Sequence, residues 1–365
     1  MTRDCIHCAL PRNRRGAVRP SPSTVTASLG RILAALLACA PLLAMWSAPA
    51  RSATRDYYFT PIGSERGLAQ NTVTAMVQDS RGFVWVGTQG GLHRYDGQRY
   101  TRYRHDPRDP ATLPDSFITA LALEGERTLW VGSYSQYVSK IDLAKGTIQR
   151  FATDPDSGRA GRQVMALLAH HGHLWIATPE GLERLDPATG EHRQVVKLEQ
   201  ERLRRSPSQQ LLADRAGNVW WASAAGLFRV GRDGKARLVG APVPTHSLLQ
   251  DGAGVLWVGR RDGLFRLDGA GLLSRAWPLV PGPDTQRRAV RAIARAPDGA
   301  LWLSVVDDGL RRFDPAGGGV RTIREIAQVE ASLPEDTVNT LMVDRGGILD
   351  GRAGEGRGSG EEKGG

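Results

Sequence analysis

Residues 78–88 read QDSRGFVWVGT, in which an Asp-x-x-Gly turn leads into a short strand with Trp85 at its centre and Gly87 two residues later. A related arrangement returns along the chain around five more tryptophans, at Trp130, Trp175, Trp220, Trp257 and Trp302. The spacings between successive tryptophans are 45, 45, 45, 37 and 45 residues. A repeat of about 40–50 residues is typical of a propeller blade.

Each repeat keeps a small residue two positions after its tryptophan, in the order Gly87, Gly132, Ala177, Ala222, Gly259 and Ser304. A Gly-Leu pair follows in five of the six repeats. A base and then an aspartate come after it, and in the fourth repeat Gly231 stands where the aspartate is expected. Bulky rings on stacked sheets fit only where the neighbouring side chain is small. We therefore expect the small residue to make room for the tryptophan.

Alternation of apolar residues and the placing of turn residues predict four strands in each period. In the first repeat these strands are expected at 72–77, 83–88, 92–95 and 98–103. The 43 glycines among 365 residues suit a chain with many turns. The sequence thus predicts an all-β protein, a β-propeller of six four-stranded blades plus an incomplete seventh.

Three stretches of the first repeat, GLAQNTV at 67–73, QDSRGFVWVGT at 78–88 and GLHRYDG at 91–97, closely resemble the two-component regulator propeller repeat. LPDSFI at 113–118 resembles it as well, and the likeness extends over about 57–345. The resemblance implies one or two seven-bladed periplasmic propellers, an Ig-like domain, a membrane helix, and a cytoplasmic histidine kinase or diguanylate cyclase. The expected function is that of a periplasmic ligand-sensing input module of such a receptor. It would be non-catalytic, with the output domain absent from this chain.

Both ends of the propeller region are expected to contribute to its last blade. Residues 333–345, LPEDTVNTLMVDR, open a seventh repeat, and the pattern is lost after them. Residues 346–365 are rich in glycine and are predicted to be a disordered tail. At the other end, YYFT at 57–60 is predicted to be a lone outer strand that completes the last blade. The propeller sensor domain is therefore assigned to 51–345.

Residues 1–50 have the layout of a secretory signal peptide. A basic stretch is followed by the apolar run Ile32–Trp46 and by Ala48-Pro49-Ala50, which predicts cleavage after Ala50 and a periplasmic location. An uncleaved anchor, which would tether the chain to the inner membrane, is the alternative, and a lipoprotein signal at Cys39 is a third. Contact with a membrane is expected only through such a leader or through a downstream helix.

The charge balance gives no support to nucleic-acid binding. Of the formal net charge of +10, half lies in residues 1–50, which hold six arginines and the single acid Asp4. The other basic residues recur once per repeat instead of forming one stripe. Cys5 and Cys8 form a C-x-x-C, but a zinc site needs four ligands and no second pair follows. No metal is predicted.

Signatures of catalysis are missing from the sequence. There is no H-E-x-x-H, no G-x-S-x-G, no P-loop and no GGDEF-like run, so neither an enzyme nor a cofactor is predicted. His170, His171 and His173 form a dense cluster, but by register they fall in the first turn of the third blade. A solvated turn is the preferred interpretation.

Ligands of propellers bind where the loops before the innermost strands converge at the mouth of the central channel. Those positions lie about fourteen residues before each tryptophan and, except for Val243, they are polar. The predicted site residues are Asn71, Ser116, Arg162, Ser206, Arg288 and, in the seventh repeat, Asp336. A ring of this kind would suit a sugar or an anionic oligosaccharide, although loops are also polar for reasons of solvation alone.

Two other classes of function stay open. One is a propeller enzyme of the streptogramin-lyase or glycosidase type, for which His246 is the nearest histidine to the mouth. The other is a protein-binding scaffold, which an exposed aromatic patch would favour. The intact receptor could also form a homodimer.

Overall fold

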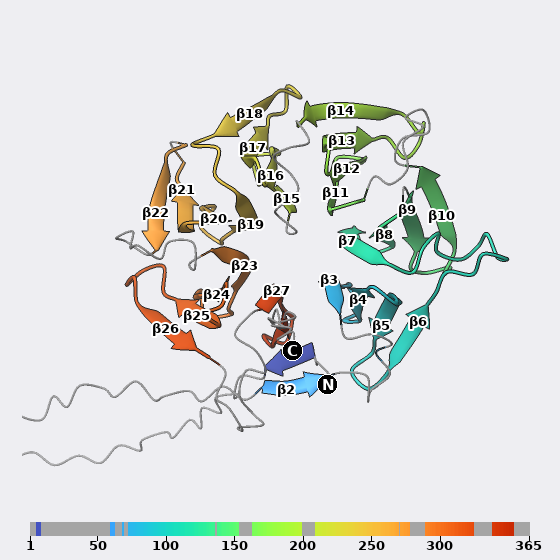
Figure 1. Ribbon diagram of the computed structural model, residues 1–365, viewed down its shortest axis with the longest axis horizontal. Coiled ribbons are helices and arrows are strands. Elements are labelled where there is room, and N and C mark those ends of the chain that lie inside the picture. The colour runs from blue at the N-terminus through green and yellow to red at the C-terminus, as the bar shows by residue number, and fades with distance from the viewer. Residues whose placement is uncertain are drawn as a thin grey trace, which may run out of the picture. The chain divides into compact units, whose positions relative to one another are not determined.

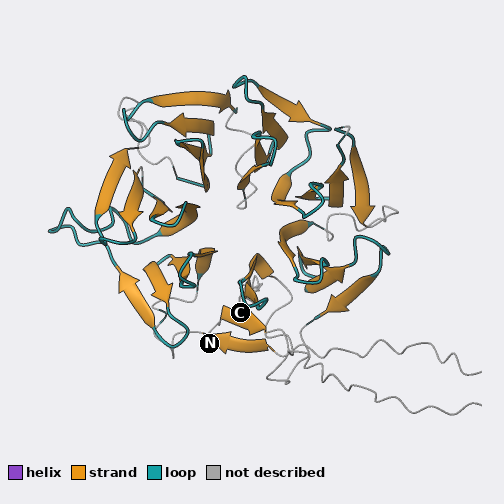
Figure 2. Cartoon of the chain, turned by 180° about the vertical axis from the view of Figure 1, so that it is seen from behind, coloured by secondary structure: helices purple, strands orange, loops and turns teal. Residues whose placement is uncertain are grey.

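The computed structural model describes residues 5–8, 59–62, 68, 72–135, 137–152, 163–198, 209–269, 271–277, 289–324 and 338–353. These residues belong to one compact unit. They form seven four-stranded antiparallel sheets arranged around a common axis (Figure 1). The described part of the chain contains strands and loops but no helix (Figure 2). No helix long and apolar enough to span a membrane occurs within the same residues.

Six blades are each built from four consecutive strands, with the first strand innermost. Blade 1 contains β3 (Val73–Gln78), β4 (Val84–Thr88), β5 (Gly91–Tyr95) and β6 (Tyr100–Tyr103). Blade 2 contains β7 (Ile118–Glu124), β8 (Thr128–Ser133), β9 (Tyr137–Asp142) and β10 (Ile148–Ala152). Blade 3 contains β11 (Ala166–His170), β12 (His173–Thr178), β13 (Gly181–Leu185) and β14 (His192–Lys197).

The remaining three complete repeats follow the same order. Blade 4 contains β15 (Gln210–Ala213), β16 (Val219–Ser223), β17 (Gly226–Val230) and β18 (Ala236–Val239). Blade 5 contains β19 (Thr245–Gln250), β20 (Leu256–Arg260), β21 (Gly263–Leu267) and β22 (Leu273–Trp277). Blade 6 contains β23 (Val290–Arg295), β24 (Leu301–Val305), β25 (Leu310–Phe313) and β26 (Val320–Ile323). The predicted propeller with six four-stranded blades is confirmed.

The seventh sheet draws its strands from both ends of the chain, in the order β2-β1-β28-β27. The seventh repeat itself supplies only β27 (Val338–Val343) and β28 (Leu349–Ala353). The outer strand is β2 (Phe59–Ile62), as the sequence predicts, although Tyr57 and Tyr58 lie outside the described residues. Because β27 contacts β3 of blade 1, the ring closes.

Two boundaries drawn from the sequence need comment. The expected disordered tail, 346–365, begins too early, because β28 pairs with β27 in the register Val343↔Leu349 and so extends the blade to Ala353. Glycines in that stretch did not prevent a paired strand. The third strand of this sheet, β1 (Cys5–Cys8), lies inside the segment predicted to be a signal peptide. Cleavage after Ala50 would separate β1 from the rest of the chain, and the signal peptide stays a prediction.

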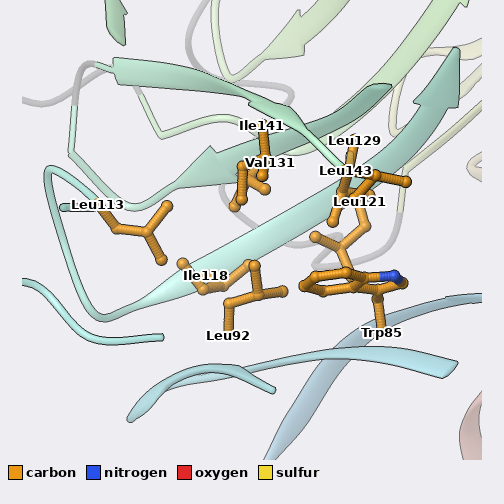
Figure 3. Packing of buried hydrophobic residues seen from close by; sticks show 9 residues of the cluster. All are labelled: Trp85, Leu92, Leu113, Ile118, Leu121, Leu129, Val131, Ile141 and Leu143. Atoms are coloured by element: carbon orange, nitrogen blue, oxygen red, sulfur yellow. The ribbon is translucent and has the colours of Figure 1, made fainter. Parts of the chain in front are cut away.

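The hydrophobic core is divided into layers between neighbouring blades. Figure 3 shows the first layer, in which Trp85 and Leu92 of blade 1 face Ile118, Leu121 and Val131 of blade 2. Equivalent layers follow around Trp130, Trp175, Trp220 and Trp257. Every layer takes its tryptophan from one blade and most of its aliphatic side chains from the next. A blade therefore buries its apolar faces only against its neighbours, which is why the repeats must form a ring.

The small residue after each tryptophan has a different role from the one expected. A Cβ added at Gly87 would lie 2.8 Å from Cγ2 of Ile118, and one at Gly132 would lie 2.5 Å from Cγ1 of Val164. Both neighbours belong to the start of the next blade's innermost strand. The room is thus needed by the next blade's aliphatic side chain and not by the tryptophan ring.

The tryptophan is oriented by a hydrogen bond from its indole to a carboxylate six residues earlier. Nε1 of Trp85 donates to Oδ2 of Asp79 at 3.0 Å, and Asp79 also accepts the backbone N–H groups of Arg81 and Phe83. The same indole bond occurs at Trp130 with Glu124, Trp220 with Asp214 and Trp257 with Asp251. One acidic residue therefore closes the first hairpin turn and fixes the ring at the blade interface.

Placing a methyl group at Gly259 tests the close approach between blades. A Cβ there would lie 2.7 Å from the backbone oxygen of Val290, which cannot rotate away. We expect Gly259→Ala to lower the free energy of unfolding by about 2 kcal/mol, because the packed blades would have to move apart. Urea unfolding of the full chain measures this. Gly269→Ala is the control, since nothing lies within 4 Å of its added Cβ. An equal effect of both substitutions would contradict the packing argument.

His93 in blade 1 predicts an acid-sensitive core. Its side chain is fully buried next to Tyr100, and burial, assisted by the charge of Arg102, lowers the pKa of His93 to about 4. The unfolded chain protonates this histidine near pH 6.5, so its contribution to stability is complete above pH 6.5 and is lost as the pH falls toward 4. The loss amounts to at most about 3 kcal/mol.

By strand register, blades 4 and 5 carry Phe228 and Phe265 at the position of His93. We therefore expect His93→Phe to reduce the fall in unfolding free energy between pH 7 and pH 4.5, measured as the difference from the unmodified chain. Identical pH dependence in the two proteins would show that His93 is not the titrating group.

Candidate functional site

Five of the seven innermost strands carry a β-bulge at their second residue. The register of each pair skips one position, so the bulged residue has no partner on the adjacent strand. The five residues, which we call the bulge ring, are Thr74 in β3, Thr119 in β7, His246 in β19, Arg291 in β23 and Asn339 in β27. All five are polar and partly buried. Bulges redirect a side chain away from the regular alternation and are frequent at functional sites.

The bulge ring lies one residue inside the start of each innermost strand. In Figure 1 these strands face the central axis, and their starts lie at one end of the channel. The preceding loops therefore form the channel mouth, and the bulge ring lies just below it. Because the seven blades approach one another most closely here, side chains from several blades can contact one small ligand.

Printed contacts between blades show that bulged side chains reach the neighbouring innermost strand. Oγ1 of Thr74 donates to the backbone oxygen of Ile118 at 2.6 Å. Nη1 of Arg291 donates to Oδ1 of Asn339 at 2.6 Å, across the junction of blades 6 and 7. Both contacts run along the wall of the channel. The bulge ring is thus a connected polar surface rather than a set of separate loops.

Arg291 supplies the charge of the bulge ring. Burial lowers the pKa of its guanidinium from the ordinary value, and the nearby carboxylate of Asp307 opposes that shift. A guanidinium stays protonated in proteins even when its pKa is lowered. No residue of the bulge ring is acidic, so its electrostatic field favours a neutral or anionic ligand.

Blades 3 and 4 depart from this arrangement because β11 and β15 pair regularly with their neighbours. Blade 4 instead uses two glutamines at the start of β15. Oε1 of Gln209 accepts the indole N–H of Trp221 at 3.0 Å, and Oε1 of Gln210 accepts the backbone N–H of Leu248 at 2.8 Å. The second bond joins blades 4 and 5. Polar contacts between inner strands therefore continue where the bulges stop.

Of the site residues predicted from the sequence, the structure describes Ser116. Its Oγ accepts the backbone N–H of His105 at 3.4 Å, so it stabilises the loop that leads into blade 2. The others, Asn71, Arg162, Ser206, Arg288 and Asp336, lie outside the described residues. Their role as a binding ring stays a prediction.

The bulge ring was missed because the spacing argument stopped three residues too early. A sequence signal for it exists. In each case a polar residue directly follows a buried residue at the start of the strand, as in Val73-Thr74, Ile118-Thr119 and Val290-Arg291. Regular alternation would place such a residue on the opposite face of the sheet. Only the pairing register shows that it is a bulge.

An aromatic pair lies beside Ser116 at the same end of the propeller. The rings of Phe117 and Tyr134 are stacked at 5.1 Å, and Tyr134 is 52% exposed. Asp115 holds the pair in place, because its carboxylate accepts the backbone N–H groups of Phe117 and Ser135 from two different loops. An exposed ring face next to polar groups can take part in binding at the mouth.

The histidine cluster lies in the turn between β11 and β12, as predicted from the register. The rings of His170 and His171 are 3.9 Å apart, and burial together with the neighbouring His171 lowers the pKa of His170. Nδ1 of His173 contacts the backbone oxygen of His171 at 2.9 Å. In the portion of the chain with described coordinates, no group of three metal-ligating side chains is found.

Comparisons with known proteins agree with the repeat pattern. Residues 67–90 match the model of the family described as Two component regulator propeller. A curated relative named Histidine kinase P4, from Formosa agariphila, is 42% identical over 55 residues. Those residues are 15% of this chain and only 4% of the relative, so the chain spans a small part of its length.

Solved structures share the fold at low sequence identity. The extracellular domain of a putative hybrid two component system from B. thetaiotaomicron matches with a TM-score of 0.64 and 19% identity, over 81% of this chain and 42% of that one. Virginiamycin B lyase from Staphylococcus aureus matches with a TM-score of 0.56 and 13% identity, over 78% of this chain and 96% of the lyase. Both likenesses concern the propeller architecture.

Proposed function

We propose, from the two-component regulator propeller repeat at residues 67–90, that this propeller is the ligand-sensing input module of an exported signalling receptor. Its ligand would bind at the channel mouth, against the bulge ring. The observation that carries this proposal is the recurrence of the bulge. Five separate blades place a polar side chain at the same depth of the channel, although a propeller core requires none there.

The chemistry of the bulge ring favours a sugar or an anionic oligosaccharide. Thr74, Thr119 and Asn339 offer hydroxyl and amide groups, which exchange hydrogen bonds with sugar hydroxyls. Arg291 offers a guanidinium fork that matches a carboxylate or sulfate group. Tyr134, exposed at the same end, can pack against an apolar sugar face.

The fold also suits the role of an input module. Each blade contacts only its two neighbours, and polar bonds such as Arg291 to Asn339 join them at the inner strands. A ligand that bridges several blades would bring those strands to one fixed spacing. This change could be passed to the rest of a receptor as a shift between two arrangements of the ring.

A lyase is the second candidate, because His246 belongs to the bulge ring and a propeller lyase shares the fold. Acid–base catalysis would require an acid within reach of this histidine. The bulge ring contains none. Turnover of a bound compound, lost in His246→Ala, would favour the lyase over the sensor.

A thermal-shift titration of the full chain with neutral and anionic oligosaccharides tests the proposed sensor. A ligand at 100 times its dissociation constant should stabilise the folded state by about 2.7 kcal/mol. We expect Arg291→Met to abolish the shift caused by anionic oligosaccharides. The matched control is Arg266→Met, which removes an exposed arginine of β21 in blade 5, outside the innermost strands.

A shift that survives Arg291→Met and Thr119→Ala would place binding elsewhere on the molecule. Absence of any shift, with a cooperative melt, would contradict the sensor and favour a protein-binding scaffold around the aromatic pair Phe117 and Tyr134.

A further inference from the structure

Blade 4 carries a basic cleft at the end of its sheet opposite the channel mouth. The cleft measures about 400 Å³ and lies between the turn that joins β15 to β16 and the turn that joins β17 to β18. Its lining includes Ala216, Asn218, Arg229, Arg232, Lys235 and Arg237. Since β15 starts at the mouth, these two turns are at the far end of the blade. The basic cleft is therefore separate from the bulge ring.

Positive charge in the basic cleft is poorly compensated. Four cationic side chains line it, against one carboxylate, that of Asp233. Oδ1 of Asp233 is engaged by the backbone N–H of Lys235 at 3.1 Å. Ion pairs found among the described residues involve other arginines, in blades 1, 2, 5 and 6. The cleft thus holds a net excess of three positive charges, counting four cations minus one anion.

The excess arises from two departures from the repeat. In blade 6, Arg312 forms an ion pair with Asp298. By turn position the corresponding residues in blade 4 are Arg229 and Ala216, so the arginine is kept and its carboxylate is missing. Gly231 replaces the aspartate that the other five complete repeats carry after their third strand. Blade 4 therefore lacks a carboxylate at both positions that border the basic cleft.

Two of the arginines are held in place by the protein. Nη2 of Arg229 donates to Oδ1 of Asn218 at 2.9 Å, and Asn218 is fixed in turn by a 2.7 Å bond from Nδ2 to Asp214. The guanidinium of Arg229 also lies 5.9 Å from the ring centre of Trp220. Nε of Arg232 donates to the backbone oxygen of Ala216 at 2.7 Å. Each guanidinium uses one N–H group in these bonds and presents the others to the cleft.

Arg237 completes the arrangement on the outer strand. The register pairs Trp220 with Arg229 and Arg229 with Arg237, so the two arginines are adjacent across β17 and β18. Like charges that are directly opposite destabilise a sheet. A bound anion between them would remove that cost. Blades 1, 2 and 5 have Thr101, Gln149 and Ser274 at the position of Arg237.

We propose that the basic cleft is a second binding site, which takes a phosphate or sulfate group. Guanidinium forks match the oxygens of a tetrahedral anion, and Lys235 adds a point charge. Such a group could belong to a free inorganic ion or to a sugar ester. This site goes beyond the proposed sensing function, since it uses no residue of the channel mouth.

Isothermal titration calorimetry of the full chain with inorganic phosphate and with glucose 6-phosphate, at constant ionic strength set with sodium chloride, tests the proposal. We expect saturable binding with one site per chain. Ala216→Asp restores the carboxylate that blade 6 carries and should weaken binding at least about tenfold, because it pairs with Arg229. The matched control is Ala253→Asp, the same change in the equivalent turn of blade 5, which should leave the affinity unchanged.

Should Ala216→Asp fail to give a cooperative melt, Arg237→Gln serves as a second variant, since that side chain is exposed on an outer strand. Equal affinity of the inorganic ion and the sugar ester would identify a free anion as the ligand. Tighter binding of the ester would identify a phosphorylated or sulfated sugar. No saturable binding of either probe, or equal weakening by Ala216→Asp and Ala253→Asp, would overturn the proposal.

Discussion

The close approach of neighbouring blades is the constraint on which the rest of this structure depends. A four-stranded sheet of this size has two apolar faces and cannot bury either by itself. At Gly87, Gly132 and Gly259 the backbone of one blade lies against the first residue of the next innermost strand, with no space for a methyl group. The tryptophan beside each glycine fills the layer further out, oriented by its bond to an acidic residue. Small residue, tryptophan and acid together set the angle at which blades meet.

Closure of the ring follows from the same constraint. If the last blade were absent, blades 6 and 1 would each expose an apolar face. The chain meets this need by assembling the seventh sheet from β27 and β28 of the last repeat with β1 and β2 from the other end. Pairing of both termini in one sheet also removes free strand edges at the junction.

Functional chemistry occurs where the repeat is interrupted. At the mouth, bulges turn the second residue of an innermost strand out of the regular alternation, which brings Arg291 and Asn339 into contact across two blades. At the opposite end of blade 4, the loss of two carboxylates leaves Arg229 and its neighbours without anionic partners. The regular residues build the scaffold, and the exceptions give each blade its own surface.

The sequence by itself determined the architecture: the period of the tryptophans, the turn residues and the alternation of apolar side chains predicted the number and kind of blades and the outer strand near Phe59. Those features are local, since each depends on residues within one repeat. Tertiary structure decided what the sequence could not. Thr74 and Arg291 became channel residues because a bulge is a property of the register between two strands, and Gly87 proved to make room for Ile118 because that contact joins different blades. The strand at Leu349–Ala353 formed in a glycine-rich stretch because its partner, β27, was already in place beside it.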